Sequence, residues 1–165
     1  MNVTKNGITI SIDDSEVIRL ALLKLNAEDA KVLPAVVQRF RIGTHYEEQG
    51  GVYAGITRSE DRSYEYHLFV GPEADSAMNW NNAVAWTNEL KVNSSTDFAL
   101  PRRNEQSLMF ANVPELFKKE WYWSGVQLAG NSDYAWGQGF NNGYQSYWFK
   151  DCSYRVRAVR RLIIQ

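Results

Sequence analysis

The chain of 165 residues contains little cysteine and little histidine. Cys152 is its single cysteine, and one thiol cannot build the disulfide framework on which small secreted domains depend. His45 and His67 are its only histidines and are far apart in the sequence. Without clustered His and Cys ligands, a zinc or non-haem iron site would have to consist almost entirely of carboxylates. We therefore predict no metal, no cofactor, and structural roles for Cys152 and both histidines.

Long apolar runs and an excess of one charge are also missing. No stretch approaches the roughly 18 apolar residues of a membrane-spanning helix, and the first residues, MNVTKNGITISIDD, lack the apolar core of a secretory signal. Lys and Arg number 18 and Asp and Glu number 19, which gives a formal net charge of −1. We expect cytoplasmic synthesis without a signal peptide, and no membrane partner.

Charge is nevertheless distributed unevenly along the chain. Residues 51–100 carry 3 basic and 7 acidic side chains, whereas residues 101–165 carry 9 and 5. Arg155 and Arg157 alternate in a strand-like run, so both lie on one face of that strand. We predict that these arginines pair with the acidic middle segment inside one domain. Binding of nucleic acid along that face is the alternative.

Residues 1–45 form a distinct N-terminal segment. Alternating isoleucines from Ile8 to Ile12 follow an Asn-Gly turn signal and predict a half-buried strand. Residues 17–25 are apolar on more than one face of the helix that they predict. A segment of this size cannot bury much of a core alone, so such a helix needs a partner surface. We predict that the segment assembles the chain into a homo-oligomer.

Residues 46–165 have the pattern of an α+β domain. A hairpin is predicted from two β-type runs, Gly51–Thr57 and Tyr64–Val70, and helices are predicted over Ala77–Leu90 and Asn104–Phe117. Four short strands are predicted after these helices: Trp121–Ser124, Ala135–Phe140, Tyr147–Phe149 and Arg155–Val159.

Aromatic residues are concentrated near the C-terminal end. Residues 121–160 hold 11 of the 22 aromatic residues and 5 of the 11 glycines. The stretches 129–134 and 141–148 are predicted loops that mix Tyr and Trp with Asn, Ser and Gly, which is the composition of protein-binding loops. Four aromatic residues in strand-like stretches are expected to be buried in the core: Trp121, Trp123, Trp136 and Phe140.

Catalytic motifs are scarce. The sequence has no GxSxG, Walker or GxGxxG motif. Asp133 and Asp151 are the only acids in the aromatic region, and we interpret them as solvated loop residues. A carboxylate-based enzyme is an alternative, and it predicts that the two aspartates face each other across one pocket and that one has a strongly perturbed pKa.

Three blocks of sequence carry a family pattern. The first is MNWNNAVAW at residues 78–86, and the second is FALPRRNE at residues 98–105. The third extends from YWS at 122–124, through AW at 135–136 and FNNG at 140–143, to RVRAVR at 155–160. Together they resemble the C-type-lectin-like domain of the formylglycine-generating-enzyme subclass, in its Lcl C-terminal-type branch. The resemblance covers roughly residues 50–162.

The resemblance implies a C-type-lectin-like fold with two helices and a small antiparallel sheet, in which the closing arginine-rich strand pairs with the aromatic strands. Oxidases of this subclass need paired cysteines, sulfoxide synthases need a histidine cluster, and calcium-dependent lectins need disulfides and a Glu-Pro-Asn-like loop, none of which this sequence has. What the resemblance leaves is a scaffold that displays a ligand-binding surface. Proteins that use this scaffold include the phage and bacterial variable proteins of diversity-generating retroelements, whose last strands and loops carry the diversified residues.

Our main hypothesis is a non-catalytic binding protein that a phage or a prophage encodes. The resemblance also allows an association of this protein with the virion. Its C-terminal loops would contact a protein or a glycan. The alternative is a structural or regulatory oligomer whose aromatic surface is a fixed subunit interface. The candidate ligand-binding residues match the diversified region in place and chemistry: Asn131, Asp133, Tyr134, Asn141, Asn142, Tyr144, Ser146, Tyr147, Phe149 and Asp151.

Overall fold

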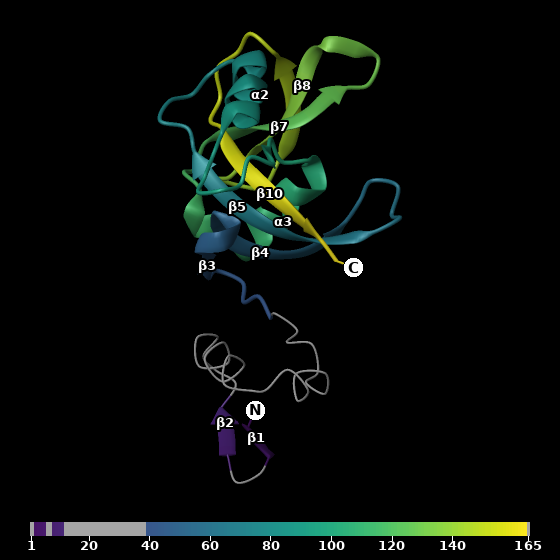
Figure 1. The fold of residues 1–165 in the computed structure, drawn as a ribbon. Helices are drawn as coiled ribbons and strands as arrows, with labels where there is room; N and C mark the ends of the chain where they lie inside the picture. Colours follow the sequence, from purple (N-terminus) through teal and green to yellow (C-terminus); the bar gives the residue numbers. More distant parts are fainter. Residues whose placement is uncertain (1, 6–7, 12–38, 165) are drawn as a thin grey trace. The chain divides into compact units, whose positions relative to one another are not determined.

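The computed structural model describes residues 2–5, 8–11 and 39–164 (Figure 1). The chain divides into two compact units, Met1–Arg39 and Phe40–Gln165. Residues 40–45, which the sequence analysis placed in the N-terminal segment, belong to the second unit. The Gly43 N–H donates to the carbonyl of Tyr53 at 2.9 Å, and the ring of Phe40 packs 4.9 Å from that of Phe69.

The first unit contains a two-stranded antiparallel sheet of β1 (Asn2–Lys5) and β2 (Ile8–Ser11). Lys5 lies opposite Ile8, so the strand predicted from the alternating isoleucines is confirmed. The helix predicted over residues 17–25, and with it the basis of the proposed assembly role, lies outside the described residues.

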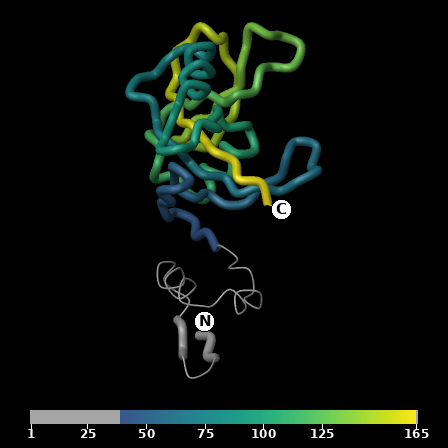
Figure 2. Tube along the Cα trace, viewed as in Figure 1, coloured from purple at the N-terminus to yellow at the C-terminus, as the bar shows by residue number. Residues whose placement is uncertain are grey.

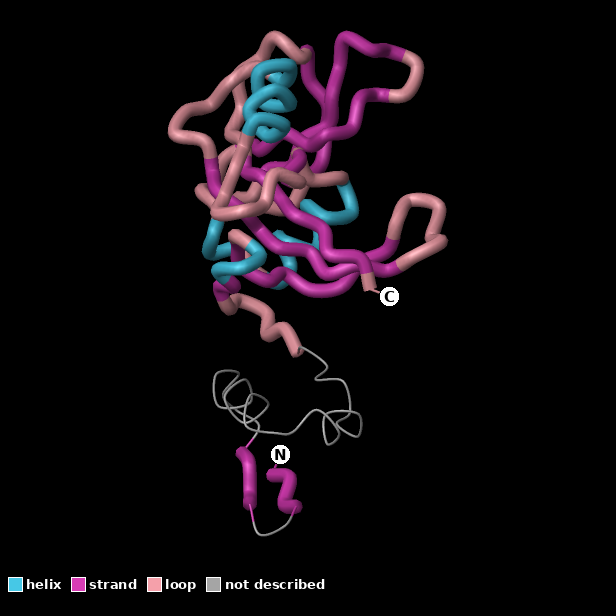
Figure 3. The backbone as a smooth tube through the Cα atoms, viewed as in Figure 1, coloured by secondary structure: helices cyan, strands magenta, loops and turns pink. Residues whose placement is uncertain are grey.

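The second unit is α+β and consists mostly of strands (Figure 3), as the sequence predicted. Its elements, in chain order, are β3 (His45–Tyr46), η2 (Glu47–Gln49), β4 (Gly51–Arg58), β5 (Glu65–Glu73), α2 (Trp80–Glu89), β6 (Phe98–Ala99), α3 (Arg103–Asn112), η3 (Pro114–Leu116), β7 (Trp121–Leu128), β8 (Asn131–Gly139), β9 (Gln145–Phe149) and β10 (Arg157–Ile163). Among the described helices, none has the length and apolar character that a bilayer span requires.

Both predicted helices occur, with shorter bounds. The Asn79 side chain caps α2 by accepting from the Asn82 N–H at 2.9 Å. Helix α3 ends at Asn112, five residues before its predicted end, because Pro114 cannot donate an N–H and begins the 3-10 turn η3 instead. The predicted hairpin is confirmed as β4 and β5.

A five-stranded antiparallel sheet has the order β3-β4-β5-β10-β6. The last strand of the chain therefore lies beside β5, far from it in the sequence (Figure 2). The prediction that the arginine-rich strand pairs with the aromatic strands is wrong, because β10 pairs with β5 and β6. Val159 of β10 lies opposite both Val70 and Ala99, in the buried middle of this sheet. Only Arg155, before the strand, bridges to Tyr122 in β7.

Strands β7, β8 and β9 form the second antiparallel sheet. Leu128 in β7 and Asn131 in β8 are partners across a tight turn, in which Gly130 has φ +84, a left-handed conformation that favours glycine. The strand therefore resumes at once, and the prediction of a loop over 129–134 is wrong. The stretch 141–148 is also not a single loop, since its second half belongs to β9.

Two hydrophobic clusters hold the unit together. Helix α3 contacts β4 as well as β7 and β8, and the first cluster lies among these elements. Helix α2 contacts β6 and β7 beside the second cluster. Trp123 and Phe140 are buried, as predicted, whereas Trp121 and Trp136 are only half-buried. The expectation that all four form the core is therefore wrong for two of them. Cys152 is a free thiol at the edge of the second cluster.

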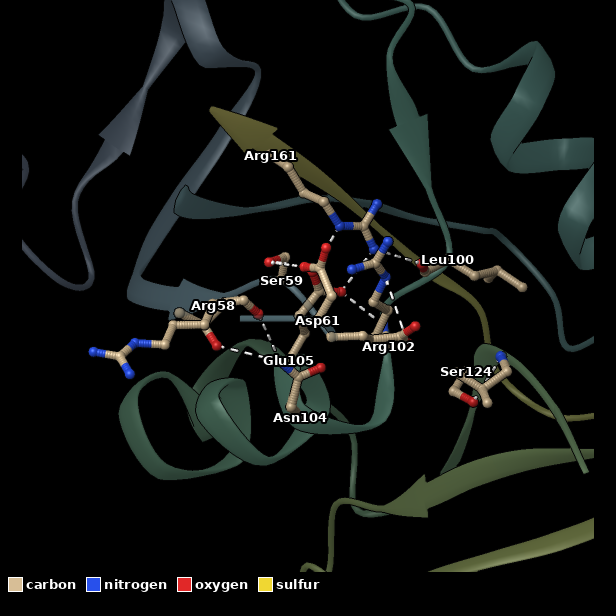
Figure 4. A network of polar contacts seen from close by, with 12 residues as sticks. Arg58, Ser59, Asp61, Leu100, Arg102, Asn104, Glu105, Ser124 and Arg161 are labelled. Carbon is tan, nitrogen blue, oxygen red and sulfur yellow. Dashed lines mark hydrogen bonds and ion pairs between the residues drawn. The ribbon is translucent and has the colours of Figure 1, made fainter. Parts of the chain in front are cut away.

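Glu105 is the centre of a buried polar network that ties α3 to the five-stranded sheet (Figure 4). Its carboxylate accepts from the Arg102 N–H at 2.6 Å and caps the helix, and it accepts from the guanidinium of Arg161 at 2.6 and 2.7 Å. The Tyr66 hydroxyl donates to it at 2.6 Å. Burial and this hydrogen bond raise the pKa of Tyr66 to about 12.

Glu73 is the centre of a second network that links the two sheets. It accepts from Arg155 and Arg157 at 2.7 Å each and from the Tyr122 hydroxyl at 3.1 Å. Burial alone would raise the pKa of Glu73, but the hydrogen bond and charge of Arg157, with the bonds from Arg155 and Tyr122, hold it below its ordinary value. The predicted pairing of these arginines with the acidic middle segment is confirmed.

Candidate functional site, an exposed aromatic ladder

Strands β8 and β9 place four aromatic side chains on one face of the three-stranded sheet. Tyr134 lies opposite Phe149, and Trp136 lies opposite Tyr147. Since side chains alternate between faces, both pairs point the same way. Ring centroids are 4.2 Å apart for Tyr134 and Phe149 and 5.2 Å apart for Trp136 and Tyr147, with 5.8 Å between Tyr134 and Tyr147. We call these four residues the aromatic ladder.

The ladder is open to solvent. Phe149 is 54% exposed and Tyr147 is 45% exposed, while Tyr134 and Trp136 are half-buried. The hairpin of β7 and β8 extends outward from the rest of the second unit (Figure 1). Large aromatic rings that meet one another at the surface form a continuous apolar patch, which is the usual mark of an interaction site.

The inner end of the ladder is held by α3. The guanidinium of Arg103 stacks 3.5 Å from the ring centre of Trp136, and its Nε donates to the Gln145 side-chain carbonyl at 3.1 Å. The Gln145 amide donates in turn to the Arg103 carbonyl at 2.8 Å and to the Gln138 side chain at 2.7 Å, where Gln138 is fully buried. The aromatic surface is therefore preorganised by the first turn of a helix.

The opposite face of this sheet carries a different group of aromatic residues. Trp148 contacts Trp121 at 4.2 Å and Tyr154 at 5.1 Å, and Tyr144 contacts Trp121 at 6.3 Å. Trp121 and Tyr154 also line a cavity of about 350 Å³. Its lining mixes charged, amide and aromatic groups: Ala77, Lys119, Glu120, Trp121, Asn141, Ser153, Tyr154 and Arg155. Burial raises the pKa of Tyr154 above its ordinary value.

The structure divides the candidate binding residues into separate groups. Tyr134, Tyr147 and Phe149 belong to the ladder. Asn131, Asp133 and Asp151 are exposed around its outer end, where the Lys150 N–H donates to the Asp133 carbonyl. The turn between β8 and β9 holds Asn141, Asn142 and Tyr144 at the other end of the hairpin. Ser146 lies opposite Gly137, on the face away from the ladder.

Tyr144 therefore does not extend the ladder, although it is 64% exposed. Its contact with Trp121 places it on the other face of the sheet from Tyr147. Three residues of the site were missed by sequence reasoning: Trp136, Arg103 and Gln145. The alternation of Tyr134 with Trp136 was a usable signal, because residues two apart in a strand share a face. No local signal identifies Arg103, which comes from a helix 33 positions earlier in the chain than Trp136.

The acidic residues do not form the pocket that the enzyme alternative predicts. Asp133 and Asp151 are both exposed, and neither lines the cavity. In the described part of the chain, no group of three or more His, Cys, Asp or Glu side chains is arranged to hold a metal ion. His67 instead contacts the Tyr53 hydroxyl through Nδ1 at 2.8 Å, and His45 lies 3.6 Å from Glu47.

Comparison with models of known protein families finds no match to this chain, and comparison with curated proteins also finds none. The function of this chain is therefore inferred from the geometry of the ladder.

Proposed function

We propose that this chain is a non-catalytic binding protein with a C-type-lectin-like fold, and that the aromatic ladder is its main contact surface. The observation that carries the proposal is the exposure of Tyr147 and Phe149 beside Tyr134 and Trp136 on a sheet whose inner end is fixed by Arg103. Tyr and Trp dominate binding energy at interfaces because they bury a large area with few rotatable bonds. A surface fixed before binding also loses little entropy when a ligand arrives.

A protein or a glycan ligand is compatible with an exposed aromatic surface that has Asn131, Asp133 and Asp151 around its outer end. Most of the residues that the family resemblance marks as diversified are exposed or lie on the ladder. We keep the phage or prophage setting and the diversification as parts of the proposal. They are tested by the DNA downstream of the gene: a near-copy of the segment encoding residues 121–160 beside a reverse transcriptase supports diversification, and its absence leaves a binder of fixed specificity.

Binding by the ladder is tested with the full chain on a glycan array and on display libraries of folded domains and of linear peptides. The double variant Tyr147→Ala/Phe149→Ala should lose every ligand that the unmodified chain selects, by about tenfold or more in Kd. Tyr144→Ala is the matched control, since it removes an exposed ring from the other face. If Tyr144→Ala loses binding and the double variant does not, the contact surface lies on the opposite face of the sheet.

A fixed subunit interface is the second candidate function, since the uncharged surface of Tyr147 and Phe149 could equally cover another copy. Sedimentation velocity on the full chain separates the two functions. If the ladder is a subunit interface, Tyr147→Ala/Phe149→Ala lowers the mass of the assembly. If it binds a separate ligand, the mass is unchanged.

The N-terminal segment is proposed to mediate homo-oligomerisation, on the sequence argument that residues 17–25 are apolar on more than one helix face. Comparison of the full chain with residues 40–165 by light scattering tests this role, because the structure divides between Arg39 and Phe40. An unchanged number of copies per particle after removal of residues 1–39 overturns it.

A further inference from the structure

Strand β9 is an edge of the three-stranded sheet, and its outer side is unpaired among the described residues. The Gly139 N–H donates to the Tyr144 carbonyl at 2.9 Å, and the Lys150 N–H donates to the Asp133 carbonyl at 2.9 Å. In an antiparallel ladder, every second residue bonds inward. Residues 144, 146, 148 and 150 therefore bond toward β8, whereas Gln145, Tyr147 and Phe149 direct their backbone groups to the open edge.

These edge groups have few partners. Of the three outward residues, the Phe149 carbonyl accepts from the Cys152 N–H at 3.0 Å. Within the described residues, no hydrogen bond occupies the N–H of Phe149 or either backbone group of Tyr147. The aromatic ladder thus ends at a strand edge that offers a complete backbone donor–acceptor pair at Tyr147.

Several other strand edges of the second unit carry features that usually prevent pairing with another chain. The strands β3 and β6 at the two edges of the larger sheet have only two residues each. Strand β4 has a bulge between Tyr53 and Gly55 and ends at Arg58. The outer side of β7 is covered, because the Trp123 N–H donates to Arg155 and the Gly125 N–H donates to Pro101.

Strand β9 has none of these features. Its sequence, QSYWF, contains no charge and no proline, and its pairing with β8 has no bulge. We propose that the ligand of this chain is a protein segment in extended conformation, which adds to the open edge of β9 as a fourth strand of the sheet. This inference rests on the proposed function. Among the possible classes of ligand, it selects a polypeptide whose contact segment is extended.

The pairing also specifies ligand side chains. In antiparallel pairing, a ligand residue opposite Tyr147 exchanges two backbone hydrogen bonds with it and places its own side chain on the ladder face, with its Cβ about 5 Å from the Cβ of Tyr147. The ligand residues two positions away lie on the same face, beside Phe149 and Gln145. We expect an aromatic or β-branched residue opposite Tyr147 and another apolar residue opposite Phe149, separated by one residue of any type.

A second copy of the chain fits this edge less well. Five residues of strand span roughly 17 Å, and a contact of that length and one strand in width covers far less than the roughly 800 Å² that each partner buries in a stable dimer. Strand addition of a peptide draws its affinity from backbone hydrogen bonds and a few side chains and needs no larger contact, whereas a stable dimer needs a larger interface than this edge alone.

The experiment starts by selecting linear seven-residue peptides from a display library on the immobilised full chain, with Tyr147→Ala/Phe149→Ala as the counter-selection. The best peptide is synthesised and then N-methylated at one amide at a time. Methylation at every second amide should weaken binding about tenfold or more, and methylation at the intervening amides should change Kd less than about threefold. If the loss of affinity does not alternate from one methylated amide to the next, strand addition is wrong.

Amide hydrogen exchange of the full chain with the same peptide gives a readout that does not alter either molecule. The Tyr147 and Phe149 amides should exchange rapidly in the free chain and slow at least about tenfold in the complex. The Ser146 and Trp148 amides already bond to β8 and serve as internal controls. Binding without slowing at Tyr147 overturns the edge as the contact but leaves the ladder as a binding surface.

Two further outcomes distinguish this inference from the proposed function. If only glycans or folded domains bind, and the double variant abolishes that binding, the proposed function stands and strand addition is wrong. If the free chain already shows slow exchange at Tyr147 that becomes rapid on dilution, a second copy occupies the edge and the inference is overturned.

Discussion

The C-terminal third of this chain supplies two regions of different composition and opposite situations. In the arginine-rich frame, Arg155, Arg157 and Arg161 are largely buried against Glu73 and Glu105. In the aromatic ladder, Tyr147 and Phe149 lie in solvent although their side chains are of the kind that usually fills a core. Arginine usually lies at the surface of a protein and large aromatic side chains usually lie inside, so both regions depart from the usual burial of their residues.

The difference shows which region is structural and which is available to a ligand. Every frame arginine that could contact an anionic ligand has a carboxylate partner from another segment. The ladder residues pack only along one side and leave their outer surface free. Four predictions would break this contrast if they failed, and they run from the largest expected effect to the smallest.

Trp123→Ala should destabilise the second unit strongly. Trp123 is fully buried between α2 and the three-stranded sheet, and removing a buried indole costs about 3–5 kcal/mol of unfolding free energy. Urea unfolding followed by far-ultraviolet circular dichroism measures the loss. A loss below about 1 kcal/mol would show that the aromatic residues of this region are not divided into core and surface as the structure has them.

Glu105→Gln should cost about 3 kcal/mol or more of unfolding free energy, because it leaves the Arg161 guanidinium buried without a charged partner. The matched control is Glu65→Gln, which breaks the exposed ion pair with Arg58 and should cost about 0–1 kcal/mol. Equal losses in the two variants, measured by urea unfolding, would mean that the frame is no more structural than a surface ion pair.

Stability should fall at both ends of the pH range. The folded-state pKa of Glu73 lies below its ordinary value of 4.5, so its contribution is complete above pH 4.5 and is lost as the pH falls through the folded value. The pKa values of Tyr66 and Tyr122 are raised to about 12, so their contribution is complete below pH 10 and is lost as the pH rises toward 12.

Unfolding free energies measured across this pH range test both limits. Glu73→Gln should flatten the acid limb. It should also change the alkaline limb, because the Tyr122 hydroxyl donates to Glu73 and this contact adds to burial in raising the pKa of Tyr122. Tyr66→Phe should flatten part of the alkaline limb. If Glu73→Gln and the unmodified chain lose the same unfolding free energy as the pH falls, the loss of stability in acid does not come from the Glu73 carboxylate.

Phe149→Ser should change the unfolding free energy least, within about 0.5 kcal/mol, since its ring is more than half exposed. The same variant should weaken binding of any ligand of the ladder. A large loss of stability, measured beside Trp123→Ala under the same conditions, would place Phe149 in a structural interface and favour the fixed subunit contact.

Local patterns in the sequence predicted much of the fold. The apolar positions of residues 77–90 and 104–117 indicated α2 and α3, and alternating residues indicated the hairpin of β4 and β5. The pattern was insufficient where a turn is very short. Gly130 lets β8 begin with only two residues between it and the end of β7, so residues rich in Asn, Ser and Asp belong to a strand although their composition is that of a loop.

The candidate site was predictable only in part. Tyr134, Tyr147 and Phe149 were identified from composition, but Tyr144 was grouped with them although it faces the other side of the sheet. Trp136 was assigned to the core because large apolar residues in strands are usually buried. It lies in the ladder because it shares a strand face with Tyr134 and pairs with Tyr147, and the guanidinium of Arg103, from a distant helix, stacks on its ring.

The sequence by itself determined the α+β class, the concentration of aromatic residues near the C-terminal end, and the pairing of basic with acidic segments. These properties follow from composition and from periodicities of two and 3.6 residues, which act over a few neighbours. Only the tertiary structure decided which aromatic residues are exposed, which carboxylate each arginine meets, and that β9 is an open edge. Those features depend on contacts between segments far apart in the chain, and periodicity contains no information about which distant segment covers a given face.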